Sequence, residues 1–542
     1  MAMKFSKYIQ AINIIILLCL SACLANPPQK QNTTQVRNVI LLIGDGMGPQ
    51  QLSLAASYRK LAQKPAGGSR ELHIEKLLRR GQTGLMLTFP YGSVVVDSAA
   101  SATQIASAQM SRSEMIGLNA DGHPAETILQ KAKKAGKSTG LVSNTRLTHA
   151  TPAAFAAQQM HRSMENQIAE DLLNGHVDVM LSGGYRYFLP ASVNERASAA
   201  YQSYRSLLPS SQPVQSSRID DIDLPQQAKK QGYELIFDRN ALLSSQGKKI
   251  LGLFGHTAMP DAIEEGLRVN ESNRELPNLL EMSKKSIEVL AKNPEGFFLM
   301  IEAGQIDWAG HANDAGTMLH EILRFDEVIG MVMEWAEKRD DTLVIVTADH
   351  ETGSFGFSYS RNNLPGPFQL KESGKTFQPN YNFGTFEVLD RIYAQKKSFT
   401  SIFNEFENLP SEQQTADVLA KLVNENVEFK ITTEQAERIL LEEDNPYYQA
   451  DSKSMNLKRF PKIDDFREFY VYAQNSRTAL LARQIAHEQQ LVWGTGTHTA
   501  TPVVVGAFGP PEAITPFNGL WHSTEISRKM MEALGLTPPE RE

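Results

Sequence analysis

The segment VRNVILLIGDGMG, residues 36–48, joins an uninterrupted apolar run to a glycine turn that carries Asp45. A run without polar alternation is typical of a strand buried on both faces, as the strands of a parallel sheet are. The two glycines around Asp45 let the backbone turn tightly and let other groups approach it closely. This segment therefore predicts a central buried strand with an acidic residue at its carboxyl end.

Similar strand signals alternate with helical ones along the chain. The other strand candidates are residues 92–97, 138–144, 177–184, 250–254, 296–303, 341–348 and 502–508. Residues 276–293 and 315–339 carry apolar side chains at helical spacing. We predict an α/β fold with a mostly parallel central sheet sandwiched between helices.

Length and composition predict a main domain with large insertions. The chain has 542 residues, which exceeds what one core usually covers. Two polar stretches, residues 188–232 and 355–489, interrupt the alternation, so we expect a catalytic domain made of residues 37–354 and 490–542. A net charge of −7 shows no basic excess, which argues against specific binding of nucleic acid. The insertion at 355–489 could cap a pocket, form a dimer contact or do neither.

The first 22 residues have the pattern of a signal peptide. Two lysines precede the apolar stretch at 12–20, which is too short to span a bilayer. The following residues, Leu20 to Cys23, resemble a bacterial lipobox, which would make Cys23 the acylated first residue of an exported lipoprotein. Ordinary cleavage after Ala25 is the alternative. We expect a periplasmic or outer-membrane-anchored protein with a tether over residues 23–36.

Acidic and imidazole side chains recur at the ends of the predicted strands, beside one serine. They are Asp45, Asp97, Ser98, Glu302, Asp307, His311, Asp349, His350 and His498. In open α/β sheets ligands collect beyond the carboxyl ends of the strands. Any one of these residues alone fits a cap or a turn. Together they predict a polynuclear metal site.

Asp307 and His311 are four residues apart, so on a helix both project from one face. With His498 they would give two imidazoles and one carboxylate, a set that suits zinc and leaves a position open for substrate or water. Asp349 and His350 are adjacent and could reach one ion only if their strand ends there.

Ser98 precedes AASATQIASAQ, a strong helix former, which places its hydroxyl at a helix amino terminus where an anion is favoured. A serine hydroxyl is a poor nucleophile unless its pKa is lowered, and a zinc ion would lower it. The alternative is that Ser98 is only an N-cap. Arg162 ends a segment predicted to be a helix from Pro152, and its guanidinium could hold two phosphoryl oxygens or simply be solvated.

The motifs IGDGMG, DSAASAT, HATPA with Arg162, EAGQIDWAGH, TADH and GTGTHT together resemble the alkaline phosphatase family over residues 37–354 and 490–508. The resemblance implies hydrolysis of phosphate monoesters through a phosphoserine on Ser98, with Arg162 as the phosphate clamp. It also implies a homodimer, two Zn²⁺ and one Mg²⁺. The implied ligands are Asp307, His311 and His498 for one zinc, Asp45, Asp349, His350 and Ser98 for the other, and Asp45, Thr151 and Glu302 for magnesium.

Two positions depart from the enteric bacterial pattern, which has Asp and Lys where this chain has His149 and Trp308. With Asp97, these residues would surround the metal ligands without being ligands themselves, and they would affect magnesium affinity and phosphate release. Trp308 could also simply pack. The rival functions are a diesterase or sulfatase of the same superfamily, against which Arg162 argues, and a surface lipoprotein that binds zinc or phosphate without turnover.

Overall fold

The computed structural model describes residues 35–268, 271, 273–452 and 454–541. Strand β1 (Asn38–Gly44) pairs in parallel with β7 (Phe297–Ala303) on one side and with β8 (Thr342–Thr347) on the other. Every residue of these three strands is buried. The uninterrupted apolar run at 39–43 therefore lies in a strand covered on both faces, as predicted.

The described residues form one ten-stranded main sheet around this centre. Its order is β18 (Gly519–His522), β2 (Gln82–Leu87), β17 (Val503–Phe508), β8, β1, β7, β3 (Ser138–Arg146), β4 (Val179–Gly183), β6 (Ile250–Leu253) and β5 (Glu234–Ile236). Strand β17 runs antiparallel to both neighbours, and the other pairs are parallel. The predicted α/β class with a mostly parallel sheet is confirmed.

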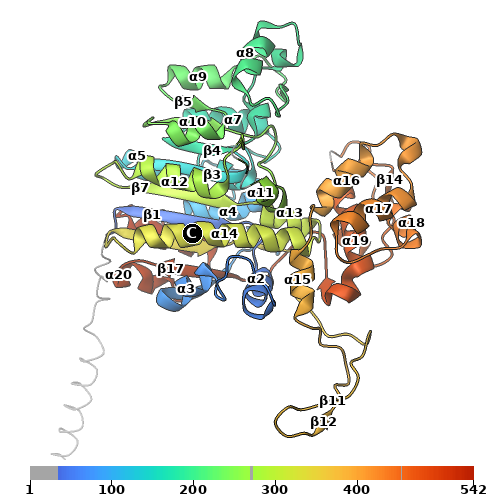
Figure 1. The fold of residues 1–542 in the computed structure, drawn as a ribbon. Coiled ribbons are helices and arrows are strands. Elements are labelled where there is room, and N and C mark those ends of the chain that lie inside the picture. Colours follow the sequence, from blue (N-terminus) through green and yellow to red (C-terminus); the bar gives the residue numbers. More distant parts are fainter. Residues whose placement is uncertain (1–34, 269–270, 272, 453, 542) are drawn as a thin grey trace, which may run out of the picture. The chain divides into compact units, whose positions relative to one another are not determined.

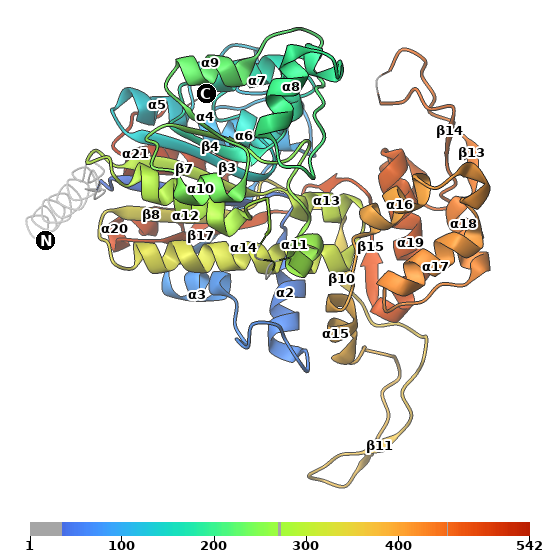
Figure 2. The ribbon, with the colours of Figure 1, turned by 45° about the horizontal axis from the view of Figure 1, so that its top comes forward.

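Helices cover both faces of this sheet (Figures 1 and 2). On one face, α12 (Leu279–Leu290) packs against α14 (Ala315–Ala336) and on β3. On the other, α4 (Ser98–Ser107) packs against α21 (Ser523–Ala533) and α5 (Ile128–Lys134). The remaining helices of this region are α2 (Pro49–Leu61), α3 (His73–Arg80), α6 (Ala150–Ala153), α7 (Glu165–Asn174), α8 (Ala199–Leu207), α9 (Leu224–Lys230), α10 (Arg239–Ser244), α11 (Ala262–Arg268), α13 (Gln305–His311) and α20 (Pro511–Ile514).

The strand predicted at residues 92–97 is wrong. This segment is a loop, and Val94 is 75% exposed. In the sheet, β2 (residues 82–87) is the strand closest in sequence to this segment, and it pairs with β17 on one side and β18 on the other. A run of three valines does not distinguish a strand from the wall of a pocket, and Val95 lines one.

The helix predicted from Pro152 to Arg162 is also wrong. Helix α6 ends at Ala153, and the chain then turns so that Gln159 pairs with Ile116 in an isolated bridge. The backbone N–H of Arg162 donates to the carbonyl of Glu114. These non-local hydrogen bonds override the helix propensity of the alanine-rich sequence.

Residues 355–489 form a helical region with its own buried aromatic side chains, Phe399, Phe403 and Phe429. Its elements are α15 (Glu387–Tyr393), α16 (Phe399–Glu407), α17 (Ala416–Asn426), α18 (Thr433–Leu440) and α19 (Ala473–Gln489), with β10 (Phe355–Phe357), β11 (Phe368–Gln369), β12 (Thr376–Phe377), β13 (Glu442–Asp444) and β14 (Arg459–Pro461). Strand β10 pairs with β15 (Leu491–Trp493), which returns the chain toward the sheet. The division into a catalytic domain and an insertion remains a prediction.

The predicted signal peptide and Cys23 lie outside the described residues, as does most of the tether. Val36, at the end of the predicted tether, is buried and donates its N–H to the carbonyl of Ala533. Among the described helices, none is both long enough and apolar enough to cross a bilayer.

Candidate active site

Ser98 is the first residue of helix α4 and is 1% exposed. The cap of this helix is Asp97, whose Oδ1 accepts from the backbone N–H of Ala100 at 3.1 Å. The alternative that Ser98 serves only as an N-cap is therefore wrong. Its hydroxyl oxygen instead lies 3.1 Å from Nε2 of His350. The local fold thus presents a buried hydroxyl at a helix amino terminus, next to an imidazole.

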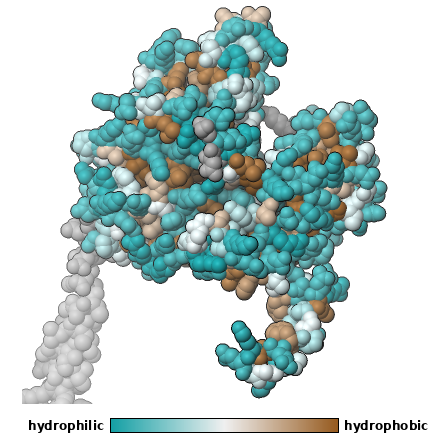
Figure 3. Space-filling view, viewed as in Figure 1, coloured by the Kyte–Doolittle hydropathy of each residue, from teal (hydrophilic) through white to brown (hydrophobic). Residues whose placement is uncertain are grey.

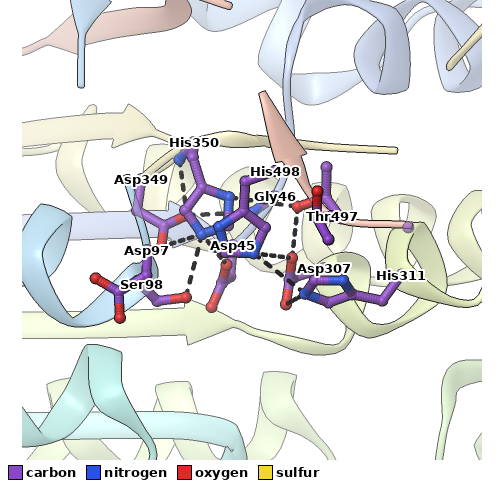
Figure 4. Close-up of polar contacts among 12 residues, drawn as sticks. Asp45, Gly46, Asp97, Ser98, Asp307, His311, Asp349, His350, Thr497 and His498 are labelled. Atoms are coloured by element: carbon purple, nitrogen blue, oxygen red, sulfur yellow. Dashed lines mark hydrogen bonds and ion pairs between the residues drawn. The ribbon is translucent and has the colours of Figure 1, made fainter. Parts of the chain in front are cut away.

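The first candidate metal cluster joins α13 to β16 (His498–Thr499). Nε2 of His311 lies 3.3 Å from Oδ2 of Asp307, and Nε2 of His498 lies 3.5 Å from Oδ1 of Asp307. The two Nε2 atoms are 3.1 Å apart (Figure 4). Each Nδ1 donates to a backbone carbonyl, that of Gly496 at 2.7 Å and that of Val96 at 2.9 Å. Both Nε2 lone pairs are therefore left for a cation.

The second cluster forms where two neighbouring strands end. Asp45 follows β1 and Asp349 follows β8, and Oδ1 of Asp349 accepts from the N–H groups of Gly46 and His350. Nε2 of His350 lies 3.4 Å from Oδ1 of Asp45 and 3.2 Å from Oδ2 of Asp349. Figure 4 shows the carboxylate of Asp45 and the imidazole of His350 directed toward one another. Strand β8 ends at Thr347. The adjacent residues Asp349 and His350 therefore lie beyond the strand, where both side chains can reach one ion.

The third cluster lies at the end of β7. Oε1 of Glu302 is 3.7 Å from Nδ1 of His149, and the hydroxyl of Thr151 donates to Oδ2 of Asp45 at 3.4 Å. The other oxygen of Glu302 accepts from the hydroxyls of Ser143 and Thr145. Asp45 therefore belongs to two clusters. The structure places His149 nearer to the ligand atoms than the sequence suggested.

These clusters have the properties of cation sites. Oδ1 of Asp45, Oδ2 of Asp349 and Oε1 of Glu302 are buried without a hydrogen-bond partner among the described residues. Burial, with repulsion from Asp349, raises the pKa of Asp45 well above its usual value. Burial, with repulsion from Asp307, raises the pKa of Asp349 to about 7. Buried carboxylates that crowd one another without a counter-charge are costly, and bound cations would remove that cost.

Two lowered pKa values support the same interpretation. Burial alone would raise the pKa of Asp307, but His311 and His498 outweigh it and hold that pKa well below the usual value. Burial and the neighbouring His498 lower the pKa of His350 well below its usual value, so its imidazole is neutral. A neutral imidazole and an ionised carboxylate are the forms that bind metals.

Arg162 reaches the same pocket from the turn that follows α6. Its Nη1 donates to Oδ2 of Asp97 at 3.0 Å, and its Nη2 lies 3.3 Å from Nε2 of His149. Burial would lower the pKa of Arg162, but the Asp97 carboxylate outweighs it, so the guanidinium remains charged. Asp97 is thus both the N-cap of α4 and the hydrogen-bond partner of the Arg162 guanidinium.

The pocket above Ser98 has a volume of about 650 Å³, and Arg162, Asp307, His311 and His498 line it. Its walls include Trp308, whose ring meets that of His149 edge-on at 5.9 Å. Trp308 therefore lines the pocket in addition to packing against the His149 ring. The structure brings every residue named from the sequence into these clusters or the pocket above them.

The insertion also contributes to the pocket. Thr400, Tyr472, Gln474 and Asn475 line it, and the Tyr472 ring lies edge-on to that of His311 at 5.3 Å. Sequence reasoning missed these residues because nothing local marks a side chain that reaches a site built by another part of the chain. Ser143 and Thr145 were also missed, although polar residues at the carboxyl end of the apolar run at 138–144 were a usable signal.

Known proteins resemble this chain over nearly its whole length. The sequence model of the alkaline phosphatase family matches residues 36–536. Alkaline phosphatase 3 of Bacillus subtilis is 29% identical over 519 residues, which cover 94% of this chain and 91% of that protein. Alkaline phosphatase of Escherichia coli is 33% identical over 359 residues, 59% of this chain and 70% of that protein. The crystal structure of Thermus thermophilus alkaline phosphatase aligns with a TM-score of 0.74 at 26% identity, covering 95% of this chain and 97% of that one.

A mostly parallel sheet whose strand ends bring carboxylates and imidazoles to one serine is the arrangement expected of a metal-dependent hydrolase. The chain belongs to the alkaline phosphatase family. It is therefore a phosphatase, of a family that hydrolyses phosphate monoesters through a phosphoserine intermediate.

Proposed function

We propose that Ser98 is the residue that becomes phosphorylated and that Arg162 holds the phosphoryl oxygens. The observation that supports this is the position of the Ser98 hydroxyl, 3.1 Å from His350 and at the amino terminus of α4. The N–H groups of that first turn and the Arg162 guanidinium carry the positive charge that a phosphate group requires.

The proposed reaction has two steps. The Ser98 oxygen forms a bond to phosphorus as the bond to the ester oxygen breaks, and the proton that Ser98 loses ends on the departing alcohol. Water then cleaves the phosphoserine, which returns the serine and releases inorganic phosphate. Arg162 holds the non-bridging oxygens throughout, and Asp97 keeps its guanidinium aimed at the pocket.

We assign the cations by donor chemistry. Asp307, His311 and His498 suit zinc, as do Asp45, Asp349 and His350, which lie beside the Ser98 hydroxyl. Glu302, Asp45 and Thr151 offer oxygen atoms that suit magnesium, and the nearby His149 ring makes that position less selective. Such cations supply positive charge that lowers the pKa of a hydroxyl and stabilises a departing alkoxide.

The insertion selects the leaving group in this proposal. Tyr472 and Asn475 of the insertion line the pocket together with Val95. The alcohol part of the ester would contact these side chains once the phosphate group is bound beside Ser98. An aromatic leaving group would bury the most area against the Tyr472 ring.

The test is phosphoenzyme trapping. The wild-type protein, incubated with labelled phosphate at low pH and quenched in acid, should retain one label per active chain on Ser98. Ser98→Ala should retain none, whereas Ser107→Ala, on the same helix, should label like the wild type. Label on Ser98→Ala would contradict the assignment. Equal rates on a monoester and a matched diester would favour the diesterase reading.

Export and acylation are proposals for the chain's amino-terminal end. From the signal-peptide pattern of residues 1–22, we propose that this chain is exported and is a periplasmic or outer-membrane-anchored lipoprotein attached through Cys23. Intact mass of the mature protein distinguishes the two cleavage sites, because an acylated Cys23 adds fatty-acid mass and cleavage after Ala25 does not. If Cys23 is the acylated residue, Cys23→Ser should lack the fatty-acid mass and should no longer be anchored to the membrane.

We also propose a homodimer, with its contact on the segment 357–386. This segment exposes aromatic side chains, and Tyr359, Tyr381 and Phe383 lie against one another on the surface. Figure 3 shows hydrophobic residues along the hairpin of β11 and β12. Exposed apolar patches commonly mark protein contacts. Light scattering should give a dimer that Phe383→Ser with Phe386→Ser converts to monomer.

A further inference from the structure

Thr352 adjoins residues of both the first and the second candidate metal cluster. It is fully buried in the short strand β9 (Glu351–Thr352), where it pairs with His498 of β16. It also follows His350 by two residues. The rings of His350 and His498 stack with their centroids 3.6 Å apart, so the two clusters are neighbours (Figure 4).

The Thr352 hydroxyl contacts one candidate ligand of each cluster. It donates to Oδ1 of Asp307, and its oxygen lies 3.3 Å from Nδ1 of His350. A carboxylate can only accept a hydrogen bond, and a hydroxyl has one proton to donate. Because that proton is directed at Asp307, the hydroxyl can only accept from His350. The ring proton of His350 is therefore on Nδ1.

This tautomer leaves a lone pair on the other ring nitrogen of His350. Nε2 lies 3.1 Å from the Ser98 hydroxyl oxygen, 3.4 Å from Oδ1 of Asp45 and 3.2 Å from Oδ2 of Asp349. A lone pair beside two carboxylates is unfavourable unless a cation or a donated proton lies between them. The tautomer that Thr352 selects is thus the one in which His350 can bind a cation.

His350 differs from the other two imidazoles in the group that holds its Nδ1. His311 and His498 donate to backbone carbonyls, those of Gly496 and Val96. The partner of His350 is a side-chain hydroxyl. A single substitution can therefore remove this partner, which is not possible for a backbone carbonyl.

Two glycines make room for Thr352. A Cβ added at Gly46 would lie 2.8 Å from the Thr352 hydroxyl oxygen, and one added at Gly310 would lie 2.9 Å from the Thr352 Cβ. Gly46 follows Asp45, and Gly310 precedes His311. Thr352 is thus packed between the turn of the second cluster and the helix of the first.

We propose that Thr352 is a positioning residue for both clusters: its hydroxyl fixes the tautomer of His350 and orients the carboxylate of Asp307, which raises the affinity of both clusters for cations. Hydrogen-bond partners of metal ligands act in this way because they hold each ligand in its binding form and orientation. This role rests on the cation assignment of the proposed function, but it does not require phosphorylation of Ser98.

Zinc affinity tests this role. A chelator of known affinity competes with the full-length, zinc-loaded protein, which gives the dissociation constant of zinc. Thr352→Val replaces the hydroxyl with a methyl group of nearly the same shape, so zinc should bind about 10- to 100-fold more weakly. Thr352→Ala places no methyl group against Asp307 and should lose a similar amount. Thr352→Ser keeps the hydroxyl and should bind zinc almost as tightly as the wild type.

Thr139→Val is the matched control. Thr139 is also buried, and its hydroxyl lies 3.4 Å from Oδ2 of Asp178. It is the second residue of β3, so it lies away from the carboxyl ends of the strands, where the candidate ligands gather. Thr139→Val should bind zinc like the wild type.

Melting temperatures with and without zinc separate positioning from general stability. A ligand that binds only the folded state raises the melting temperature, and the rise grows with its affinity. Thr352→Val should therefore show a smaller rise with zinc than the wild type. A lower melting temperature without zinc, together with an unchanged rise, would show that Thr352 only supports the fold and would overturn the proposal.

Cadmium-113 NMR tests whether Thr352 acts on both clusters. Cadmium binds the same types of ligand as zinc, and its chemical shift reports the ligands of each site separately. The signal that is lost in His498→Ala belongs to the first cluster. Both cluster signals should shift in Thr352→Val, and neither should shift in Thr139→Val. A shift of one signal alone would overturn the role in both clusters.

The outcomes for Thr352 and for Ser98 can be told apart. Wild-type zinc affinity in both Thr352→Val and Thr352→Ala would overturn the positioning role alone. A wild-type protein that binds no zinc would overturn this role together with the cation assignment. A wild-type protein that binds zinc but takes no label on Ser98 would overturn only the assignment of the phosphorylated residue.

Discussion

Gln395 donates from Nε2 to both carboxylate oxygens of Asp314, at 2.9 and 3.1 Å. Asp314 caps helix α14, three residues after His311, and its Oδ2 also accepts from the N–H of Phe399 at 2.7 Å. One buried carboxylate therefore ties the insertion to the turn between α14 and α13, the helix that carries the candidate metal ligands Asp307 and His311.

Replacing Asp314 tests this connection. Asp314→Ala removes the helix cap and leaves buried donors on Gln395 and Phe399 unpaired, so we expect a loss of about 2–4 kcal/mol in the free energy of unfolding. Urea denaturation followed by tryptophan fluorescence measures it. Asp417→Ala, in the exposed part of the insertion, is the control and should change stability little. An Asp314→Ala protein as stable as the wild type would show that the insertion is held elsewhere.

Removing metal ions should reduce both stability and activity. Without cations, Asp45 and Asp349 crowd each other in a buried site, so chelation should lower the melting temperature and abolish hydrolysis. Zinc followed by magnesium should restore both, and anomalous scattering at the zinc edge should place ions at the two imidazole clusters. His498→Ala should show a smaller chelator effect. Hydrolysis that survives exhaustive chelation would contradict the metal assignment.

Arg162→Lys tests the phosphate clamp. A lysine keeps the charge but loses the planar pair of donors, so inorganic phosphate should inhibit roughly 10- to 100-fold more weakly. The inhibition constant against p-nitrophenyl phosphate measures this. Arg186→Lys, a matched change outside the pocket, should leave it unaltered. Equal inhibition in Arg162→Lys and the wild type would remove Arg162 from the phosphate site.

Trp308→Lys tests the departure from the enteric bacterial pattern. Trp308 lines the pocket beside His149, so a lysine there would add positive charge near the phosphate position. Inorganic phosphate should then inhibit more tightly and product release should slow. Trp308→Gln separates the charge from the loss of the ring and should not tighten inhibition. If both variants behave alike, the ring and not the charge controls release.

Tyr58 sets a limit on alkaline stability. Its side chain is fully buried, and burial raises its pKa to about 12. The folded state therefore binds the phenol proton more tightly than the unfolded chain does. The resulting contribution of Tyr58 to the free energy of unfolding is complete below about pH 10 and is lost as the pH rises to about 12. The stability of Tyr58→Phe should fall less over this interval than that of the wild type. Parallel curves for the two proteins would show that Tyr58 does not titrate on unfolding.

Much of the site could be predicted because its ligands lie at strand ends. Asp45 and Asp349 follow buried apolar runs, and the carboxyl ends of parallel strands meet at one edge of the sheet. Asp307 and His311 could be paired because helical spacing is local. The loop at 92–97 could not be predicted, since three valines suit a strand and a pocket wall equally well. The turn that delivers Arg162 depends on hydrogen bonds to residues 114–116, which the alanine-rich segment itself does not signal.

The order of apolar runs and the polar residues that end them were enough to predict the fold class and the candidate metal-ligating side chains, because those features depend on neighbours close in the chain. The spacing of the ligand atoms and the entry of Tyr472 into the pocket were decided by tertiary packing. They join segments hundreds of residues apart, and only the burial of one surface against another determines which side chains meet there.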